Sequence, residues 1–252
     1  MLLSEILDSD ECTLAGGTAR PDNDGIGRDI GPMIGRQPID LHLTSDAADL
    51  IINSDAIIDF TTPASTLAHA ALAAQHSTVV VIGTTGLSAD DEDVLRVAGE
   101  KTKIVYAPNM SVGVVLLSAL VEKVSQTLAD DYDIEIVEMH HRNKVDAPSG
   151  TALGLGQAAA RGRGVALDDV RQSTRDGNTG ARKTGDIGFA TLRGGDVIGD
   201  HTVVFAGAGE RIELSHKASN RQIYARGAVR AALWAKQQPN GLYSMRDVLG
   251  LG

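Results

Sequence analysis

The sequence has few cysteines, few aromatic residues and no long apolar run, and each scarcity excludes a class of protein. Its 252 residues include one cysteine, Cys12, so a disulfide framework and a site built on two thiolates are both excluded. Aromatic residues make up 3% of the chain, which argues against a base-stacking platform for nucleic acids. No apolar stretch approaches the roughly 18 residues of a membrane-spanning helix. The chain begins without a basic leader segment, and we expect a cytoplasmic protein.

Basic charge is also in short supply. The chain has 23 Lys and Arg against 33 Asp and Glu, a formal net charge of −10. This balance argues against nucleic acid or an anionic membrane as the main partner. The hydrophobic fraction of 42% and the charged fraction of 22% are ordinary for a globular protein, and the length suits one large or two small domains.

The first half of the chain alternates short apolar runs with helical patterns. Strands are predicted over 12–15, 56–60, 78–82 and 103–106. The continuous β-branched run 78–82 is typical of a strand buried on both faces. Ser88 and Asp91 have the spacing of a capping box at the start of a helix. This rhythm predicts an α/β domain, with a parallel sheet and helices on its faces.

The second half has a different pattern, with strands in succession. Strands are predicted over 133–139, 187–192, 201–205 and 211–216. They favour a mixed or antiparallel sheet, and hence an α+β domain. Residues 161–185 are predicted to form a long exposed connection, and the amphipathic helix 222–236 is predicted to return to the first domain. The expected domains are 1–110 with 220–252, and 111–219.

The densest group of reactive side chains lies at 138–151 and begins with Glu138. Two histidines, an arginine and a lysine occur within five residues of an acidic chain, and Ser149-Gly150-Thr151 then opens a helix. Free N–H groups at a helix N-terminus, with nearby hydroxyls, bind anions. We therefore expect a small polyanion such as a dicarboxylate here. His140 and Lys144 have the chemistry to transfer protons to it.

Two considerations limit this interpretation. On a straight strand His140 and His141 would point to opposite faces, so at most one reaches a ligand unless the chain bends. A solvated basic loop beside a capped helix would have the same local sequence. A metal site is disfavoured because neighbouring positions on an extended chain diverge and no third ligand is evident.

Polar turns also follow each predicted parallel strand of the first half. Ligands of such sheets bind at the carboxyl ends of the strands, so these turns together outline a dinucleotide crevice. The turns occupy residues 16–20, 60–63, 83–86 and 107–109. No G-x-G-x-x-G turn precedes the first helix, and the chain starts inside that helix.

The segment 140–152, with sequence HHRNKVDAPSGTA, closely resembles the signature of the 4-hydroxy-tetrahydrodipicolinate reductase family, also called dihydrodipicolinate reductase. Further matches occur in order along the whole chain. They are Asp59-Phe60-Thr61, Gly83-Thr84-Thr85-Gly86, 107–114, 187–190, 216–219, 227–230 and 245–249. The resemblance implies reduction of 4-hydroxy-tetrahydrodipicolinate by NAD(P)H in the diaminopimelate route to lysine.

The resemblance also implies an architecture and a set of site residues. It implies a Rossmann-like domain for the cofactor and an α+β domain that binds the cyclic dicarboxylate and forms a homotetramer. His140 matches a proton donor and acceptor, and Lys144 a proton donor. Substrate carboxylates are assigned to His141, Ser149, Gly150 and Thr151. The implied cofactor contacts are Phe60, Thr61, Gly83, Thr84, Thr85, Ala107, Pro108, Asn109 and Met110.

The chain departs from the family pattern in three places. The opening strand and its glycine turn are missing, which suggests an N-terminally truncated chain. Ala19-Arg20 lacks the acidic residue that usually holds the adenosine ribose, and Arg20 can meet a 2′-phosphate, which favours NADPH over NADH. Met110 stands where Phe is common, a tolerable apolar exchange. Arg221 is compatible with a substrate contact, a hinge position or a solvated helix start.

Two other functions stay open from the sequence. One is another NAD(P) oxidoreductase of similar architecture, such as an amino-acid dehydrogenase. The other is a cofactor-free binding or scaffold protein, supported only by the missing glycine turn.

Overall fold

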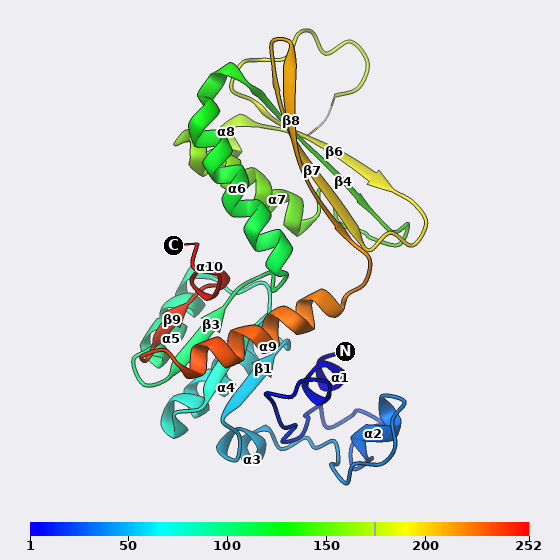
Figure 1. Ribbon diagram of the computed structural model, residues 1–252, viewed down its shortest axis with the longest axis vertical. Coiled ribbons are helices and arrows are strands. Elements are labelled where there is room, and N and C mark those ends of the chain that lie inside the picture. The colour runs from blue at the N-terminus through cyan, green and yellow to red at the C-terminus, as the bar shows by residue number, and fades with distance from the viewer. Residues whose placement is uncertain (174, 252) are drawn as a thin grey trace. The chain divides into compact units, whose positions relative to one another are not determined.

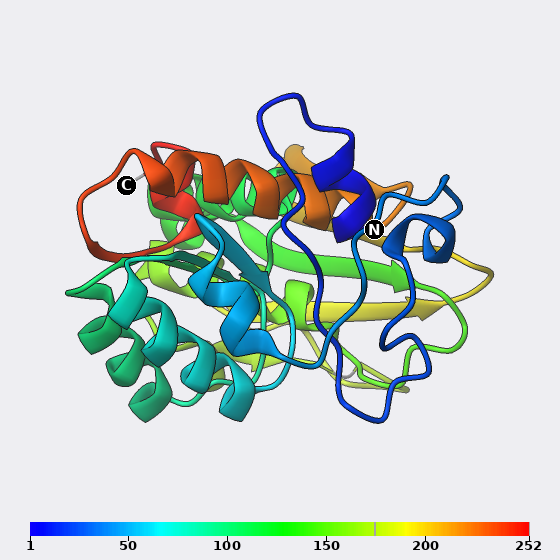
Figure 2. The same cartoon turned by 90° about the horizontal axis from the view of Figure 1, so that it is seen from below.

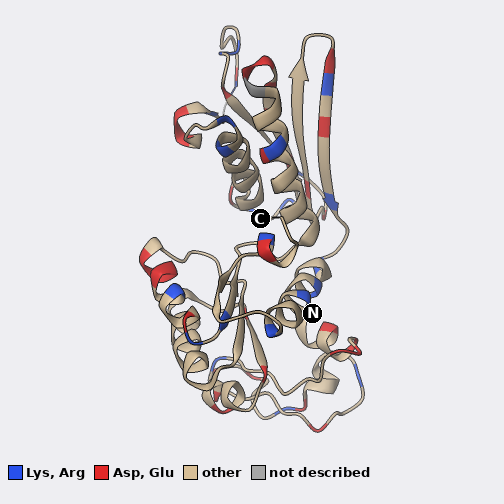
Figure 3. Ribbon diagram, turned by 60° about the vertical axis from the view of Figure 1, so that its left-hand side comes forward, with Lys and Arg blue, Asp and Glu red and all other residues tan. Residues whose placement is uncertain are grey.

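The computed structural model describes residues 1–173 and 175–251, and the chain divides into two compact units. The first unit comprises Met1–Met110 and Gln222–Gly250, and the second comprises Ser111–Arg221 with Leu251. Acidic and basic residues are interspersed over both units (Figure 3). Among the described residues no helix is long and apolar enough to cross a membrane.

The first unit is built on a parallel sheet, which confirms the Rossmann-like prediction. Its strand order is β1-β2-β3-β9, and every neighbouring pair is parallel. The strands are β1 (Ala56–Asp59), β2 (Val79–Ile82), β3 (Lys103–Tyr106) and β9 (Gly241–Tyr243). All four residues of β2 are buried, because helices cover both faces of the sheet. Figure 2 shows α4 (Pro63–His76) and α5 (Ala89–Gly99) on one side and α9 (Gln222–Lys236) on the other.

Local sequence explains where these helices begin. The Thr62 side chain accepts from the Ser65 N–H at the start of α4, and Pro63 takes the first helical position. The predicted capping box of Ser88 and Asp91 is present at the start of α5. The shorter helices of this unit are α1 (Leu2–Leu7), α2 (Ile30–Met33), α3 (Ala47–Ile52) and α10 (Met245–Val248).

The predicted strand over 12–15 is wrong. Within the described residues this segment pairs with no strand, and the nearest bridge joins Thr18 to Thr44. An apolar run becomes a strand only where a neighbour completes its hydrogen bonds. Leu14 packs instead with Ile30 and Leu43 in a small core of its own.

The second unit contains the mixed sheet that the sequence predicts. Its order is β5-β6-β4-β7-β8, with β4 parallel to β6 and antiparallel to β7. The strands are β4 (Asp133–His140), β5 (Arg171–Gln172), β6 (Ile187–Arg193), β7 (Gly199–Gly207) and β8 (Glu210–Ala218). Figure 1 shows α6 (Val112–Leu128) and α7 (Gly150–Arg163) side by side next to this sheet. Gly162 allows their close approach, since a Cβ there would lie 2.3 Å from the Glu122 carbonyl oxygen.

The expected exposed connection over 161–185 is partly structured. Helix α7 continues to Arg163, and α8 (Leu167–Val170) leads into β5. Outside this segment, the 3-10 turn η1 (Ala129–Asp131) precedes β4. Hydrophobic side chains of α8, Leu167 and Val170, pack against the unit's core, so the segment cannot stay fully exposed.

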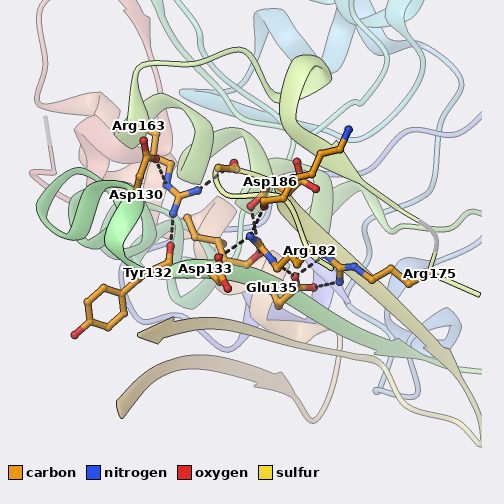
Figure 4. Close-up of polar contacts among 11 residues, drawn as sticks. Asp130, Tyr132, Asp133, Glu135, Arg163, Arg175, Arg182 and Asp186 are labelled. Atoms are coloured by element: carbon orange, nitrogen blue, oxygen red, sulfur yellow. Dashed lines mark hydrogen bonds and ion pairs between the residues drawn. The ribbon is translucent and has the colours of Figure 1, made fainter. Parts of the chain in front are cut away.

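A cluster of charges holds the remaining loop to the start of β4 (Figure 4). Arg182 donates to the carboxylates of Glu135 (2.9 Å) and Asp133 (2.7 Å) and to the Ile134 carbonyl (3.1 Å). Arg175 donates to both oxygens of Glu135, at 2.8 Å each. Burial alone would raise the pKa of Glu135, but the two guanidinium groups lower it overall, so the carboxylate stays charged.

Candidate active site

The inward face of β4 changes from apolar to ionisable along the strand. Alternate residues of β4 are buried, and they run Ile134, Ile136, Glu138, His140. The first two lie in the hydrophobic core of the second unit, whereas the last two follow it at the carboxyl end of the strand. Period-two alternation therefore delivers a carboxylate and an imidazole to one place, on one face of the sheet.

Glu138 is the centre of the resulting hydrogen-bond network. Its carboxylate accepts from His140 Nδ1 at 2.6 Å, from the two terminal nitrogens of Arg193 at 2.8 and 3.0 Å, and from the Ser149 N–H at 3.0 Å. Burial alone would raise the pKa of Glu138, but the bonds from Arg193 and His140 lower it overall. Glu138 is therefore an ionised carboxylate, although only 1% of the residue is exposed.

Ser149 caps α7 and is itself buried. Its hydroxyl oxygen accepts from the Ala152 N–H at 3.1 Å and lies 3.0 Å from His201 Nε2. The register of β4 and β7 pairs Glu138 with His201, which brings this second imidazole into the group. Gly150 is the first residue of α7 and is exposed, and Thr151 follows it in the first turn. The predicted helix N-terminus is thus present, with Ser149 beneath it.

His201 is an imidazole without a full set of partners. Only 4% of the residue is exposed, and its Nδ1 has no hydrogen-bond partner among the described residues. Burial, reinforced by the nearby His140, lowers the pKa of His201 to about 4, so the ring is neutral at physiological pH. The two rings meet edge to face with centroids 5.1 Å apart.

The loop after β4 carries His141 and Lys144. Strand β4 ends at His140, and the Lys144 N–H donates to the His141 carbonyl at 3.1 Å in the turn that follows. Lys144 Nζ is 2.7 Å from an Asp146 oxygen, and its side chain is 20% exposed. The Asp146 carbonyl accepts from Arg193 at 2.6 Å, which links this loop to the Glu138 network. Lys144 and His140 therefore belong to one connected group.

The predicted cofactor residues lie at the carboxyl ends of β1, β2 and β3, which meet at one edge because the strands are parallel. Phe60, Thr61, Thr85 and Pro108 are exposed, whereas Gly83, Thr84 and Ala107 are buried and Asn109 is half-buried. A Cβ on Gly83 would lie 2.2 Å from the Phe60 ring, so only glycine lets this ring lie over the strand end.

A buried network supports this edge from within. Asp59 accepts from the Thr61 N–H (2.9 Å), the Thr61 hydroxyl (2.6 Å) and His69 Nδ1 (2.8 Å). The Thr84 hydroxyl accepts from the Thr61 N–H at 3.0 Å and from Thr66 at 2.8 Å. Burial alone would raise the pKa of Asp59, but His69 and Thr61 lower it overall. The Thr84 side chain therefore faces the interior.

The third strand end is held by α9. A Cβ on Gly227 would lie 1.7 Å from the Met110 carbonyl oxygen, so the helix packs directly on this backbone. Met110 is buried, an environment that suits an apolar side chain. Arg20 has an 87% exposed side chain, 3.7 Å from Asp22, and Arg221 is exposed at the end of the second unit.

Several residues of the site were not found from sequence. Arg193 and His201 carry no motif of their own, and Glu138 opens the 138–151 cluster without a role that the pattern assigns. The signal for Glu138 is an ionisable residue at an inward position of an alternating strand. Asp59 lay in a matched motif, but its pairing with His69 was not expected. In the described part of the chain, no group of three or more His, Cys, Asp or Glu side chains is arranged to hold a metal ion.

Comparison with known proteins identifies a family over nearly the whole chain. The family model described as dihydrodipicolinate reductase, N-terminus, matches residues 1–110, and that for the C-terminus matches residues 113–249. The 4-hydroxy-tetrahydrodipicolinate reductase of Dinoroseobacter shibae is 55% identical over 251 residues, covering 100% of this chain and 93% of the relative. That of Parvibaculum lavamentivorans is 56% identical over 251 residues, covering 99% and 93%.

A solved structure gives the same result. The dipicolinate-bound dihydrodipicolinate reductase of Paenisporosarcina sp. TG-14 has a TM-score of 0.71 and 25% identity, covering 96% of this chain and 91% of that one. Fold, motifs and relatives agree, and this chain belongs to the dihydrodipicolinate reductase family.

Proposed function

We propose that this chain, an NAD(P)H-dependent oxidoreductase, reduces 4-hydroxy-tetrahydrodipicolinate with His140 and Lys144 as its proton-transferring residues. One observation carries the assignment of roles: a buried carboxylate holds the His140 imidazole beside the N-terminus of α7. A proton donor and an anion-binding helix end thus occur together. With full-length relatives of this activity, an amino-acid dehydrogenase and a cofactor-free scaffold lose their support.

The reaction sets the demand for protons. In going from 4-hydroxy-tetrahydrodipicolinate to tetrahydrodipicolinate, the ring loses its hydroxyl as water and gains a hydride and a proton. The nicotinamide, when bound, supplies the hydride. Protein groups then supply protons and offset the negative charge that builds toward the ring nitrogen and its conjugate carbon. The Lys144 ammonium and the His140 imidazole have the chemistry for both tasks, and they belong to one hydrogen-bonded group.

The substrate's carboxylates fit the start of α7. Helix α7 spans 14 residues, and its first N–H groups and macrodipole favour an anion. Gly150 is exposed there and a Cβ on it would meet nothing within 4 Å, so a carboxylate has room to approach the backbone. We assign carboxylate contacts to Gly150 and Thr151, with His141 as a further donor from the adjacent loop.

The first unit fits a nicotinamide cofactor at the ends of its parallel strands. The exposed Phe60, Thr61 and Thr85, with the close-packed backbone at Gly83, supply an aromatic surface and polar groups. Ala107, Pro108, Asn109 and Met110 complete this edge from β3. The Arg20 side chain is exposed and lies 3.7 Å from Asp22, so its guanidinium is accessible to a 2′-phosphate, and we propose NADPH as the preferred cofactor.

We further propose a homotetramer formed through the second unit, in the cytoplasm. Helices α6 and α7 pack on one face of its sheet, which buries the inward residues Ile134 and Phe205. On the opposite face Leu192, paired in register with Met139, is 50% exposed. Val137 pairs with Ala190 on this same face, beside Met139 and Leu192, and a contiguous apolar patch on an open sheet face supports contact with a second copy.

The test is steady-state oxidation of NADPH and NADH by the full chain. Substrate is generated in place from pyruvate and aspartate semialdehyde by the preceding synthase. We expect turnover, a higher kcat/KM with NADPH, and a loss of about 10²-fold or more in kcat for Lys144→Ala. Lys183→Ala, which removes an exposed lysine from a loop of the same unit, should keep wild-type turnover.

Each outcome bears on a separate part of the proposal. No turnover by the wild-type chain would refute the activity. Equal turnover in Lys144→Ala would refute the role of Lys144, and a higher kcat/KM with NADH would refute the NADPH preference.

A further inference from the structure

We infer that Glu138 is the positioning residue of the substrate site: its one carboxylate sets both the tautomer of His140 and the place of the α7 N-terminus. The catalytic part of this inference rests on the function proposed above. The argument begins with the hydrogen bonds of Glu138. Both oxygens are used, one by the Ser149 N–H and an Arg193 nitrogen, the other by His140 Nδ1 and the second Arg193 nitrogen.

An ionised carboxylate only accepts, and this decides where the His140 proton lies. Arg193 balances the charge of Glu138 in a two-point ion pair, so the carboxylate is kept charged at 1% exposure. His140 must therefore donate from Nδ1. In the neutral imidazole the second nitrogen, Nε2, then carries no proton and is the atom that takes up or releases one.

The surroundings of Nε2 agree with this role. Glycine is the residue across from it on β7, and a Cβ on Gly199 would lie 2.9 Å from His140 Nε2. Within the described parts of the chain Nε2 has no hydrogen-bond partner, whereas Nδ1 is bound to Glu138 at 2.6 Å. The ring is thus fixed at one nitrogen and open at the other.

The same carboxylate anchors the helix that receives the substrate's carboxylate. The Ser149 N–H donates to Glu138, and the Ser149 hydroxyl accepts from the Ala152 N–H and contacts His201. Ser149 is 2% exposed. Its polar groups are turned inward, so Ser149 holds the helix start in place and the contact with substrate begins at Gly150. This changes the role that the resemblance implies for Ser149.

The variant Glu138→Gln tests whether Glu138 positions the His140 ring and its proton or only stabilises the fold. Glutamine keeps the shape and one acceptor oxygen, but it places an NH₂ donor where an oxygen stood. If that NH₂ faces His140, Nδ1 must accept and the proton moves to Nε2. We expect kcat to fall by about 10²-fold or more, because Nε2 then cannot take up a proton and no carboxylate stabilises the imidazolium from which His140 gives one up. The Kd for pyridine-2,6-dicarboxylate should change by less than about fivefold, because the glutamine oxygen can still accept from Ser149.

The direct readout is the tautomer of His140, from the ¹⁵N chemical shifts of its ring in uniformly labelled full-length protein. We expect Nδ1–H in the wild type and Nε2–H in Glu138→Gln. Because this substitution leaves Arg193 without its partner, the variant risks failing to fold. Glu138→Gln/Arg193→Met removes both charges and should fold with the same tautomer change and the same loss of kcat. Glu213→Gln, which neutralises an exposed carboxylate on β8, is the control and should match the wild type.

The outcomes separate the two proposals. A wild-type His140 with Nε2–H, or a folded double variant with wild-type kcat, overturns the role of Glu138. A wild-type chain that shows the Nδ1–H tautomer and binds pyridine-2,6-dicarboxylate, but does not turn over, overturns the proposed function and leaves the positioning intact.

Discussion

At the scale of single residues, His201 couples the substrate site to pH. Its pKa of about 4, lowered chiefly by burial from the usual 6.5, means that the folded chain binds fewer protons than the unfolded chain between these values. Stability from this residue is therefore complete above about pH 6.5 and is lost as the pH falls toward 4. The full effect is about 3 kcal/mol, of which about 2 kcal/mol is lost by pH 5.

This predicts a difference that urea denaturation can measure. On going from pH 7.5 to pH 5, the free energy of unfolding of the wild type should drop by about 2 kcal/mol more than that of His201→Gln. Gln keeps a group in reach of Ser149 but does not titrate. His76→Gln, at an exposed position of α4, should follow the wild type. Parallel pH dependence of the wild type and His201→Gln would show that His201 is not held neutral.

At the scale of elements, the contact of α9 with the end of β3 depends on a missing side chain. Gly227→Ala would put a Cβ 1.7 Å from the Met110 carbonyl oxygen, and since this neighbour is backbone, the helix or the loop must move. We expect a loss of about 1–3 kcal/mol in stability, seen as a lower Tm, and a raised KM for the cofactor. An unchanged Tm would contradict this packing.

Gly154→Ala is the matched control for that substitution. Gly154 also lies inside a long helix, α7, but a Cβ there meets nothing within 4 Å. Alanine should raise the free energy of unfolding by up to about 1 kcal/mol, because it removes the entropy cost of a helical glycine. The Tm should therefore rise slightly. Both substitutions add one methyl group inside a long helix, and only the one at Gly227 meets backbone atoms.

Helices and strands that are specified by neighbouring residues could be predicted from the sequence. A strand that depends on pairing with a distant segment could not. The start of α5 follows from Ser88 and Asp91, three residues apart, and the buried run of β2 from its own composition. The segment 12–15 has the composition of a strand, but among the residues that the structure describes it has no strand to pair with. Pairing is a property of two segments, so one segment's sequence does not decide it.

At the scale of the whole molecule, the open face of the second unit's sheet predicts assembly. Sedimentation velocity should give a mass four times that of the chain. Leu192→Glu puts a charge on the exposed apolar face and should shift the protein to smaller species. Leu116→Glu, at a similarly exposed position (43%) on α6, should leave the mass unchanged. A wild-type monomer, or equal behaviour of both variants, would refute this interface.

The amino-acid sequence by itself determined the two-part α/β and α+β organisation, the family and the helix start at Ser149, because these depend on periodicity, motif and spacing over a few residues. Only the tertiary structure decided how the site is held. Glu138 meets Arg193 across 55 residues and Ser149 meets His201 across 52. The pairing of β4 with β6 and β7 makes these contacts. Glu138 stays ionised despite its burial because Arg193 and His140 donate to it, whereas burial keeps His201 neutral.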